Sequence, residues 1–63
     1  MKKRYRIKHR HLGYLISLVS TNITTTHTNI AGLFDFDDAI TFIENRPVET
    51  MVNWVIEPVE VVS

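Results

Sequence analysis

The sequence predicts a small α+β domain in which a mainly antiparallel sheet of three to four strands carries one helix on one face. Charged side chains alternate with other residues over residues 4–11, as in a strand with one solvated face. Apolar residues recur every three or four positions over 36–43, as in an amphipathic helix. Branched aliphatic residues fill two further segments, 14–20 and 51–62. With residues 23–30 as a third strand candidate, the predicted order is β-β-β-α-β, within one domain spanning residues 1–63.

The first two segments are predicted to form a hairpin. Over residues 4–11 one side carries basic residues only, and the other carries Tyr5, Ile7, His9 and His11. Leu12-Gly13 interrupts the alternation, and glycine suits a turn. Residues 14–20 are apolar on both sides, which is typical of a central strand.

The threonine-rich segment that follows is compatible with two structures. Residues 23–31 include four threonines, which favour strands, but both sides of the segment are polar. An edge strand and a mobile loop therefore remain alternatives, because polar strands specify their register weakly.

Helix signals begin at Asp35, which is predicted to be the N-cap. Asp37 and Asp38 follow in the first turn, where the helix dipole favours carboxylates. Arg46 suits the C-terminal end, and Pro47 is expected to end the helix. The apolar stripe consists of Phe36, Ala39, Ile40, Phe42 and Ile43.

The last strand is predicted over residues 51–62. Val52, Trp54 and Ile56 share one face, and Trp54 is expected to pack in the core against the helix. Pro58 has no amide donor, so the strand must be an edge strand, bulged or ending there.

The charges divide between the two halves of the chain although the net charge is zero. Six of the seven basic residues lie in residues 1–10, and all seven acidic residues lie in residues 35–63 together with Arg46. The first 34 residues therefore carry a charge of +6, and the remainder carries −6. A helix that crosses the sheet would most naturally return the last strand beside the first, with Glu57 and Glu60 opposite basic residues. If the two strands are instead apart, the basic face is free to bind phosphates, and the sequence leaves both strand orders open.

Composition argues against several classes of function. The chain has no cysteine, which excludes disulfides, thiolate metal sites and a cysteine nucleophile. No apolar run is long enough to span a membrane, and we expect a cytoplasmic protein. A metal site formed by His9, His11 and His27 rests on a spacing that chance easily produces, so we expect no metal and no cofactor. The chain is too short to enclose a pocket beside its core and shows no nucleophile–base pair, so we expect no enzymatic activity.

Two binding functions remain. The first is a protein-interaction module that binds a protein partner or a second copy through the uncovered sheet face or a strand edge, such as the threonine-rich segment. Its candidate residues are Leu15, Val19 and Val55. The alternative is a nucleic-acid-binding accessory protein that contacts phosphates with the basic first strand. Its candidate residues are Lys3, Arg4, Arg6, Lys8 and Arg10.

Three segments carry a resemblance to a group of known proteins. These are KRYRIKHR near the start, FDFDDAITFIE in the predicted helix and IEPVEV near the end. Together they resemble small uncharacterised proteins encoded by bacteriophages and prophages of Gram-positive bacteria. The resemblance implies a setting in which small proteins bind a host or viral protein, and it transfers no site residue.

Overall fold

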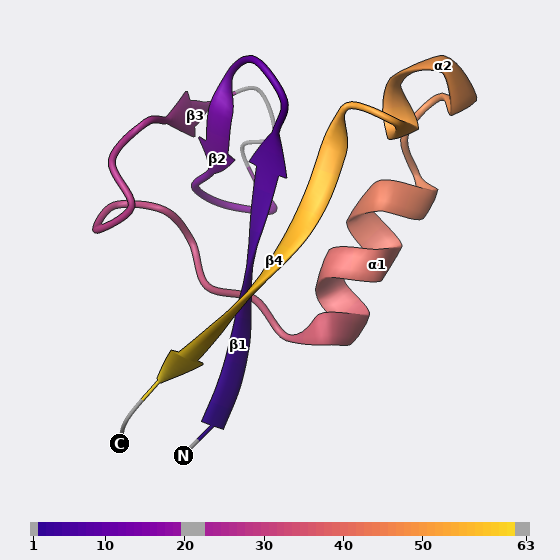
Figure 1. Ribbon diagram of the computed structural model, residues 1–63. Coiled ribbons are helices and arrows are strands. Elements are labelled where there is room, and N and C mark those ends of the chain that lie inside the picture. The colour runs from indigo at the N-terminus through magenta and orange to yellow at the C-terminus, as the bar shows by residue number, and fades with distance from the viewer. Residues whose placement is uncertain (1, 20–22, 62–63) are drawn as a thin grey trace.

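The computed structural model describes residues 2–19 and 23–61 and confirms the α+β fold. Its four strands form one antiparallel sheet in the order β3-β2-β1-β4, and α1 packs against one face (Figure 1). The elements are β1 (Lys2–His9), β2 (Gly13–Leu15), β3 (Thr24–Thr25), α1 (Phe36–Glu44), α2 (Val48–Met51) and β4 (Trp54–Val61).

The basic strand β1 lies inside the sheet. β4 pairs with it from Lys2↔Val61 to His9↔Trp54, so the first and last strands are neighbours, which decides the question that the sequence left open. The other edge of β1 pairs with β2 at one end. Further along that edge, the Tyr5 N–H donates to the Phe34 carbonyl oxygen (2.9 Å) and the Phe34 N–H donates to the Tyr5 carbonyl oxygen (2.8 Å). β1 is therefore held from both sides.

These backbone contacts establish which way the peptide groups of β4 point. In an antiparallel ladder, successive residues direct their N–H and C=O groups to opposite sides. Tyr5 directs both groups toward Phe34, away from β4, whereas the Arg10 N–H donates to the Asn53 carbonyl oxygen on the β4 side (2.7 Å). The pair Tyr5↔Pro58 is therefore a non-hydrogen-bonded pair. The missing N–H of Pro58 costs the ladder no bond, and β4 accommodates this proline as an edge strand.

Helix α1 begins where the sequence predicts. Asp35 is the N-cap residue in extended geometry (φ −71°, ψ 155°), but its side chain makes no capping hydrogen bond and instead forms an ion pair with Arg4. Asp37 and Asp38 lie in the first turn, as expected. The Arg46 guanidinium lies beyond the last turn, over the Phe42 ring with its Cζ 4.5 Å from the ring centroid.

The core lies between α1 and the sheet. Phe42 of α1 packs edge-on against Trp54 with the ring centroids 5.0 Å apart, so Trp54 packs against the core as predicted. Gly32 donates its N–H to the Leu15 carbonyl oxygen (3.0 Å), which brings the segment before α1 beside the end of β2. The buried core residues are Ile7, Leu15, Phe34, Ala39 and Phe42.

The four predicted strands have different boundaries in the structure. The second strand ends at Leu15, so the expected strand over residues 14–20 is wrong beyond that point, and Ser20 lies outside the described residues. Of residues 23–31, only Thr24–Thr25 form a strand, at the edge of the sheet. Helix α1 ends at Glu44 with Asn45 as its C-cap, and Pro47 is the N-cap of α2.

The last strand was predicted from residue 51, but Met51 belongs to α2 and β4 begins at Trp54. Val52 therefore lies outside the strand and is exposed. At the other end of the sheet, His11 lies in the turn that follows β1. The His9 Nδ1 atom accepts the N–H groups of His11 (3.0 Å) and Leu12 (3.2 Å), which fixes this turn.

Candidate functional site

One face of the sheet is not covered by α1. Residues paired across an antiparallel ladder lie on the same face, and successive residues alternate between faces. The helix covers the face that carries the buried residues Ile7 and Leu15. The other face, called the open face below, carries Arg4, Arg6, Lys8, Tyr14, Thr25, Val55, Glu57 and Val59.

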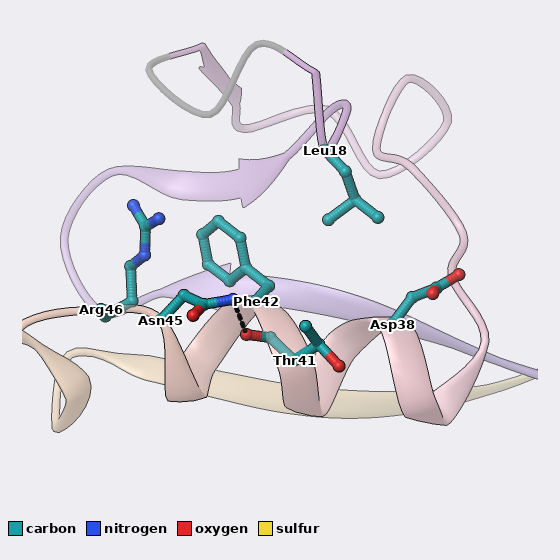
Figure 2. A pocket seen from close by; sticks show the side chains of 6 residues that line it. All are labelled: Leu18, Asp38, Thr41, Phe42, Asn45 and Arg46. Carbon is teal, nitrogen blue, oxygen red and sulfur yellow. Dashed lines mark hydrogen bonds between the residues drawn. The ribbon is translucent and has the colours of Figure 1, made fainter.

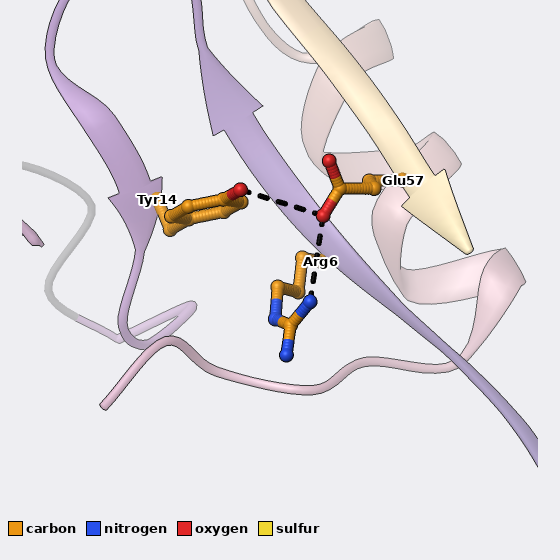
Figure 3. A network of polar contacts seen from close by, with 3 residues as sticks. All are labelled: Arg6, Tyr14 and Glu57. Carbon is orange, nitrogen blue, oxygen red and sulfur yellow. Dashed lines mark hydrogen bonds and ion pairs between the residues drawn. The ribbon is translucent and has the colours of Figure 1, made fainter. Parts of the chain in front are cut away.

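A polar cluster occupies the centre of the open face. Arg6 of β1, Tyr14 of β2 and Glu57 of β4 converge there (Figure 3). Glu57 Oε1 lies 3.4 Å from both Arg6 Nη1 and the Tyr14 hydroxyl oxygen. The Arg6 Cζ and Lys8 Nζ atoms lie 5.8 and 5.6 Å from the centroid of the Tyr14 ring, which are cation–π distances. The cluster joins three strands and engages one of the predicted phosphate-binding cations.

A second ion pair engages another of those cations. Arg4 pairs with Asp35, which connects β1 to the start of α1. Lys3 lies opposite Glu60 in the register of the sheet. Exposed ion pairs of this kind contribute only about 0.2–1 kcal/mol each, but they reduce the positive potential available to a phosphate backbone. Two of the five basic candidates, Arg4 and Arg6, are therefore paired with carboxylates within the fold.

The remaining basic candidates are more accessible. Lys8 and Arg10 are exposed, and within the described part of the chain neither forms an ion pair. Lys8 lies on the open face, whereas Arg10 lies in the turn after β1. The structure thus separates the five predicted cations. Arg6 and Lys8 lie beside Tyr14 on the open face, Arg4 pairs with Asp35, Lys3 lies opposite Glu60, and Arg10 lies in a turn.

The three apolar candidates for protein binding also lie in different places. Leu15 is 0% exposed and belongs to the core, so its expected place on the uncovered face is wrong. The hairpin register pairs Lys8 with Tyr14, which puts Tyr14 on the open face and turns Leu15 toward α1. Val19 is 93% exposed but lies beyond the end of β2. Val55 is 55% exposed and lies on the open face, as predicted.

The sequence reasoning overlooked the outer edge of β4, which is the edge that faces away from β1. No strand or bridge within residues 2–19 and 23–61 pairs with it. By the alternation described above, its outward backbone groups belong to Trp54, Ile56, Pro58 and Glu60. The signal was present in the sequence, because Pro58 required an edge, bulged or ending strand and a helix crossing the sheet would return that strand beside β1.

The three histidines considered as a metal site are not arranged as one in the structure. The ring centroids of His9 and His11 are 6.0 Å apart. In the part of the chain that the structure describes, no group of three or more His, Cys, Asp or Glu residues is arranged to hold a metal ion. Among the described helices, none is long and apolar enough to cross a membrane.

A pocket of about 230 Å³ lies between α1 and Leu18. Figure 2 shows Asp38 and Arg46 at opposite ends of this pocket, with Phe42 between them. The Asn45 side-chain amide donates to the Thr41 carbonyl oxygen (2.9 Å), so part of its hydrogen-bonding capacity is used within the helix. Asp38 and Arg46, at the two ends of the pocket, do not form an acid–base pair.

Comparisons with known proteins identify no relative. No protein-family model, no curated protein and no solved structure matches the chain.

Proposed function

We propose that the chain is a non-enzymatic interaction module that binds a protein partner by strand addition at the outer edge of β4. The observation that carries this proposal is the row of backbone groups along that edge, which is unpaired within the described residues. An extended peptide gains affinity from such a row through main-chain hydrogen bonds and gains specificity from alternate side chains. Val55, exposed on the adjoining open face, supplies an apolar contact for the added strand.

The geometry favours β4 over the threonine-rich segment. β3 has two residues, whereas β4 has eight. Along β4, Trp54 and Ile56 offer consecutive outward N–H and C=O pairs, and Pro58 interrupts the row of donors. The partner strand is therefore expected to dock along the Trp54–Ile56 half of the edge.

Nucleic-acid binding is the second candidate, and the exposure of Lys8 and Arg10 is the observation that favours it. Against it stand the zero net charge and the ion pairs of Arg4 and Arg6. The resemblance to phage and prophage proteins supports a host or viral protein as partner. The zero net charge, the two ion pairs and this resemblance therefore all favour the protein-binding proposal.

The proposal is tested by capture from a lysate of a Gram-positive bacterium, with and without nuclease. The test variant is Val55→Lys, which adds a charge beside the docking edge. Val48→Lys is its matched control, because Val48 is an exposed valine that belongs to α2 and not to β4. We expect a nuclease-resistant protein that the wild type and Val48→Lys retain and Val55→Lys loses.

A chemically synthesised chain makes the test specific to the backbone. Methylation of the Ile56 nitrogen removes one outward donor and leaves the side chain unchanged, and methylation of the Val48 nitrogen is the control at the start of α2. Capture that survives Ile56 methylation would exclude strand addition at this edge. Recovery of nucleic acid alone, abolished by nuclease, would exclude the protein partner and support the alternative.

A further inference from the structure

A second pocket lies between one end of the sheet and the chain that follows α1. Its volume is about 380 Å³, within the range of about 300–1,000 Å³ that is typical of small-molecule sites. It is lined by residues of the β1–β2 turn, β3 and the α1–α2 region, and it shares Trp54 with the docking half of the outer edge of β4. The lining residues are His9, Leu12, Thr24, Arg46, Pro47, Thr50 and Trp54.

Arg46 gives this pocket its charge. The residues that line it include no carboxylate, so the guanidinium is not neutralised from within the pocket. Stacking on the Phe42 ring holds the guanidinium in place, with 4.5 Å between Cζ and the ring centroid. The Arg46 Nε atom is buried and, among the described residues, has no hydrogen-bond partner. Arg46 also forms no ion pair among the described residues, so its charge is available to an oxyanion that contacts the guanidinium.

His9 supplies a second donor. Its Nδ1 accepts the N–H groups of His11 and Leu12, at 3.0 and 3.2 Å. In the neutral ring, an accepting Nδ1 leaves the proton on Nε2, which is then a hydrogen-bond donor. The ring packs edge-on against Trp54 with the centroids 4.8 Å apart, so its orientation is fixed.

The other lining residues indicate what kind of body the ligand would have beside its charged group. Leu12, Pro47 and Trp54 provide apolar surface, and Trp54 offers an aromatic ring for stacking. The Thr50 hydroxyl donates to the Pro47 carbonyl oxygen (2.9 Å) and is therefore already engaged, whereas Thr24 contributes a further hydroxyl group. The pocket combines two nitrogen donors with an apolar wall.

We propose that this pocket binds a small organic oxyanion, that is, a carboxylate or phosphate monoester attached to an aromatic or apolar body. Arg46 binds the oxyanion through its planar fork of N–H donors, and His9 adds one hydrogen bond. Trp54 contacts the apolar body. The pocket does not suit a cation, because no lining residue carries a negative charge.

Trp54 is the only tryptophan of the chain, and its fluorescence therefore reports directly on the pocket. The probes are phenyl phosphate and benzoate at constant ionic strength, with benzamide as the neutral control. We expect a saturable change with one or both anions and none with benzamide. The two anions distinguish phosphate from carboxylate recognition. Absence of saturation with both anions, or equal binding of benzamide, would overturn the proposal.

The matched variants are Arg46→Gln and Arg10→Gln, because Arg10 is an exposed arginine outside the pocket. We expect Arg46→Gln to weaken binding by about tenfold or more, as loss of a charged bidentate contact does, and Arg10→Gln to leave it unchanged. Equal binding by wild type and Arg46→Gln would contradict the assignment. Arg46→Lys keeps the positive charge but loses the planar pair of N–H donors, so this variant should also bind the anion more weakly. It provides the test if Arg46→Gln fails to fold.

Discussion

Tyr5 of β1 lies directly opposite Pro58 of β4, in a pair whose backbone groups point away from each other. The Tyr5 groups are taken up by Phe34 on the far side of β1, whereas those of Pro58 face the outer edge of β4. The proline therefore occupies a position where it costs the fold no hydrogen bond and limits what can pair with the edge. The central strand and the candidate docking edge follow from the same register.

Replacing Pro58 with valine tests this relationship. Pro58→Val restores an outward N–H group and should reduce the free energy of unfolding by only about 0.4–1 kcal/mol, through the greater entropy of the unfolded chain. The longer row of donors should also increase self-association, measured by sedimentation velocity over a range of concentrations. A loss of several kcal/mol would show that Pro58 has a packing role that the register does not assign to it.

Leu15→Ala tests the placement of β2. The side chain is fully buried in the core, so its truncation should lower the free energy of unfolding by about 2–5 kcal/mol in chemical denaturation. Val19→Ala is the control, because Val19 is 93% exposed and its truncation should change stability by less than about 0.5 kcal/mol. Similar effects of the two substitutions would contradict the hairpin register.

Gly13→Ala tests the turn that fixes this register. Gly13 has φ +100°, and a Cβ atom built on it would lie 2.5 Å from the Thr25 carbonyl oxygen. Both the backbone strain and this close approach should destabilise the domain by about 1–3 kcal/mol. Thr26→Ala, at an exposed neighbouring position, is expected to be nearly neutral. Thermal unfolding of the two variants makes the comparison, and a neutral Gly13→Ala would count against the turn.

The Arg6–Glu57 contact should contribute little to stability. The Arg6 and Glu57 side chains are 22% and 39% exposed, and their closest atoms are 3.4 Å apart. A double-mutant cycle with Arg6→Ala and Glu57→Ala should therefore give a coupling energy of about 0.2–1 kcal/mol that decreases with salt. A coupling of several kcal/mol would mean that the cluster is a main support of the sheet.

The sequence predicted the features that periodicity and charge determine. The alternation from Arg4 predicted the first strand, Asp35 and the apolar stripe predicted α1, and the division of charge made β4 beside β1 one of two strand orders left open. These signals are local, or they depend on charge totals that do not change when a boundary moves by one residue.

The hairpin register was not predicted correctly, and it decides which side chains face α1. Residues 14–19 are apolar on both sides, so periodicity alone did not distinguish Tyr14 from Leu15. The pair His9↔Gly13, which encloses a three-residue turn, puts Leu15 in the core. The second pocket was also beyond prediction, because it joins Arg46 to His9 and Trp54 from separate elements.

Hydrogen exchange of individual β4 amides, measured by NMR, tests the central claim most directly. The register predicts slow exchange at Val55, Glu57 and Val59, whose N–H groups point toward β1, and fast exchange at Ile56 and Glu60, whose N–H groups point outward. Addition of the captured partner should slow the exchange of Ile56 specifically. The reverse pattern in the free protein, with Ile56 protected and Glu57 exchanging rapidly, would contradict the register and with it the proposed docking edge.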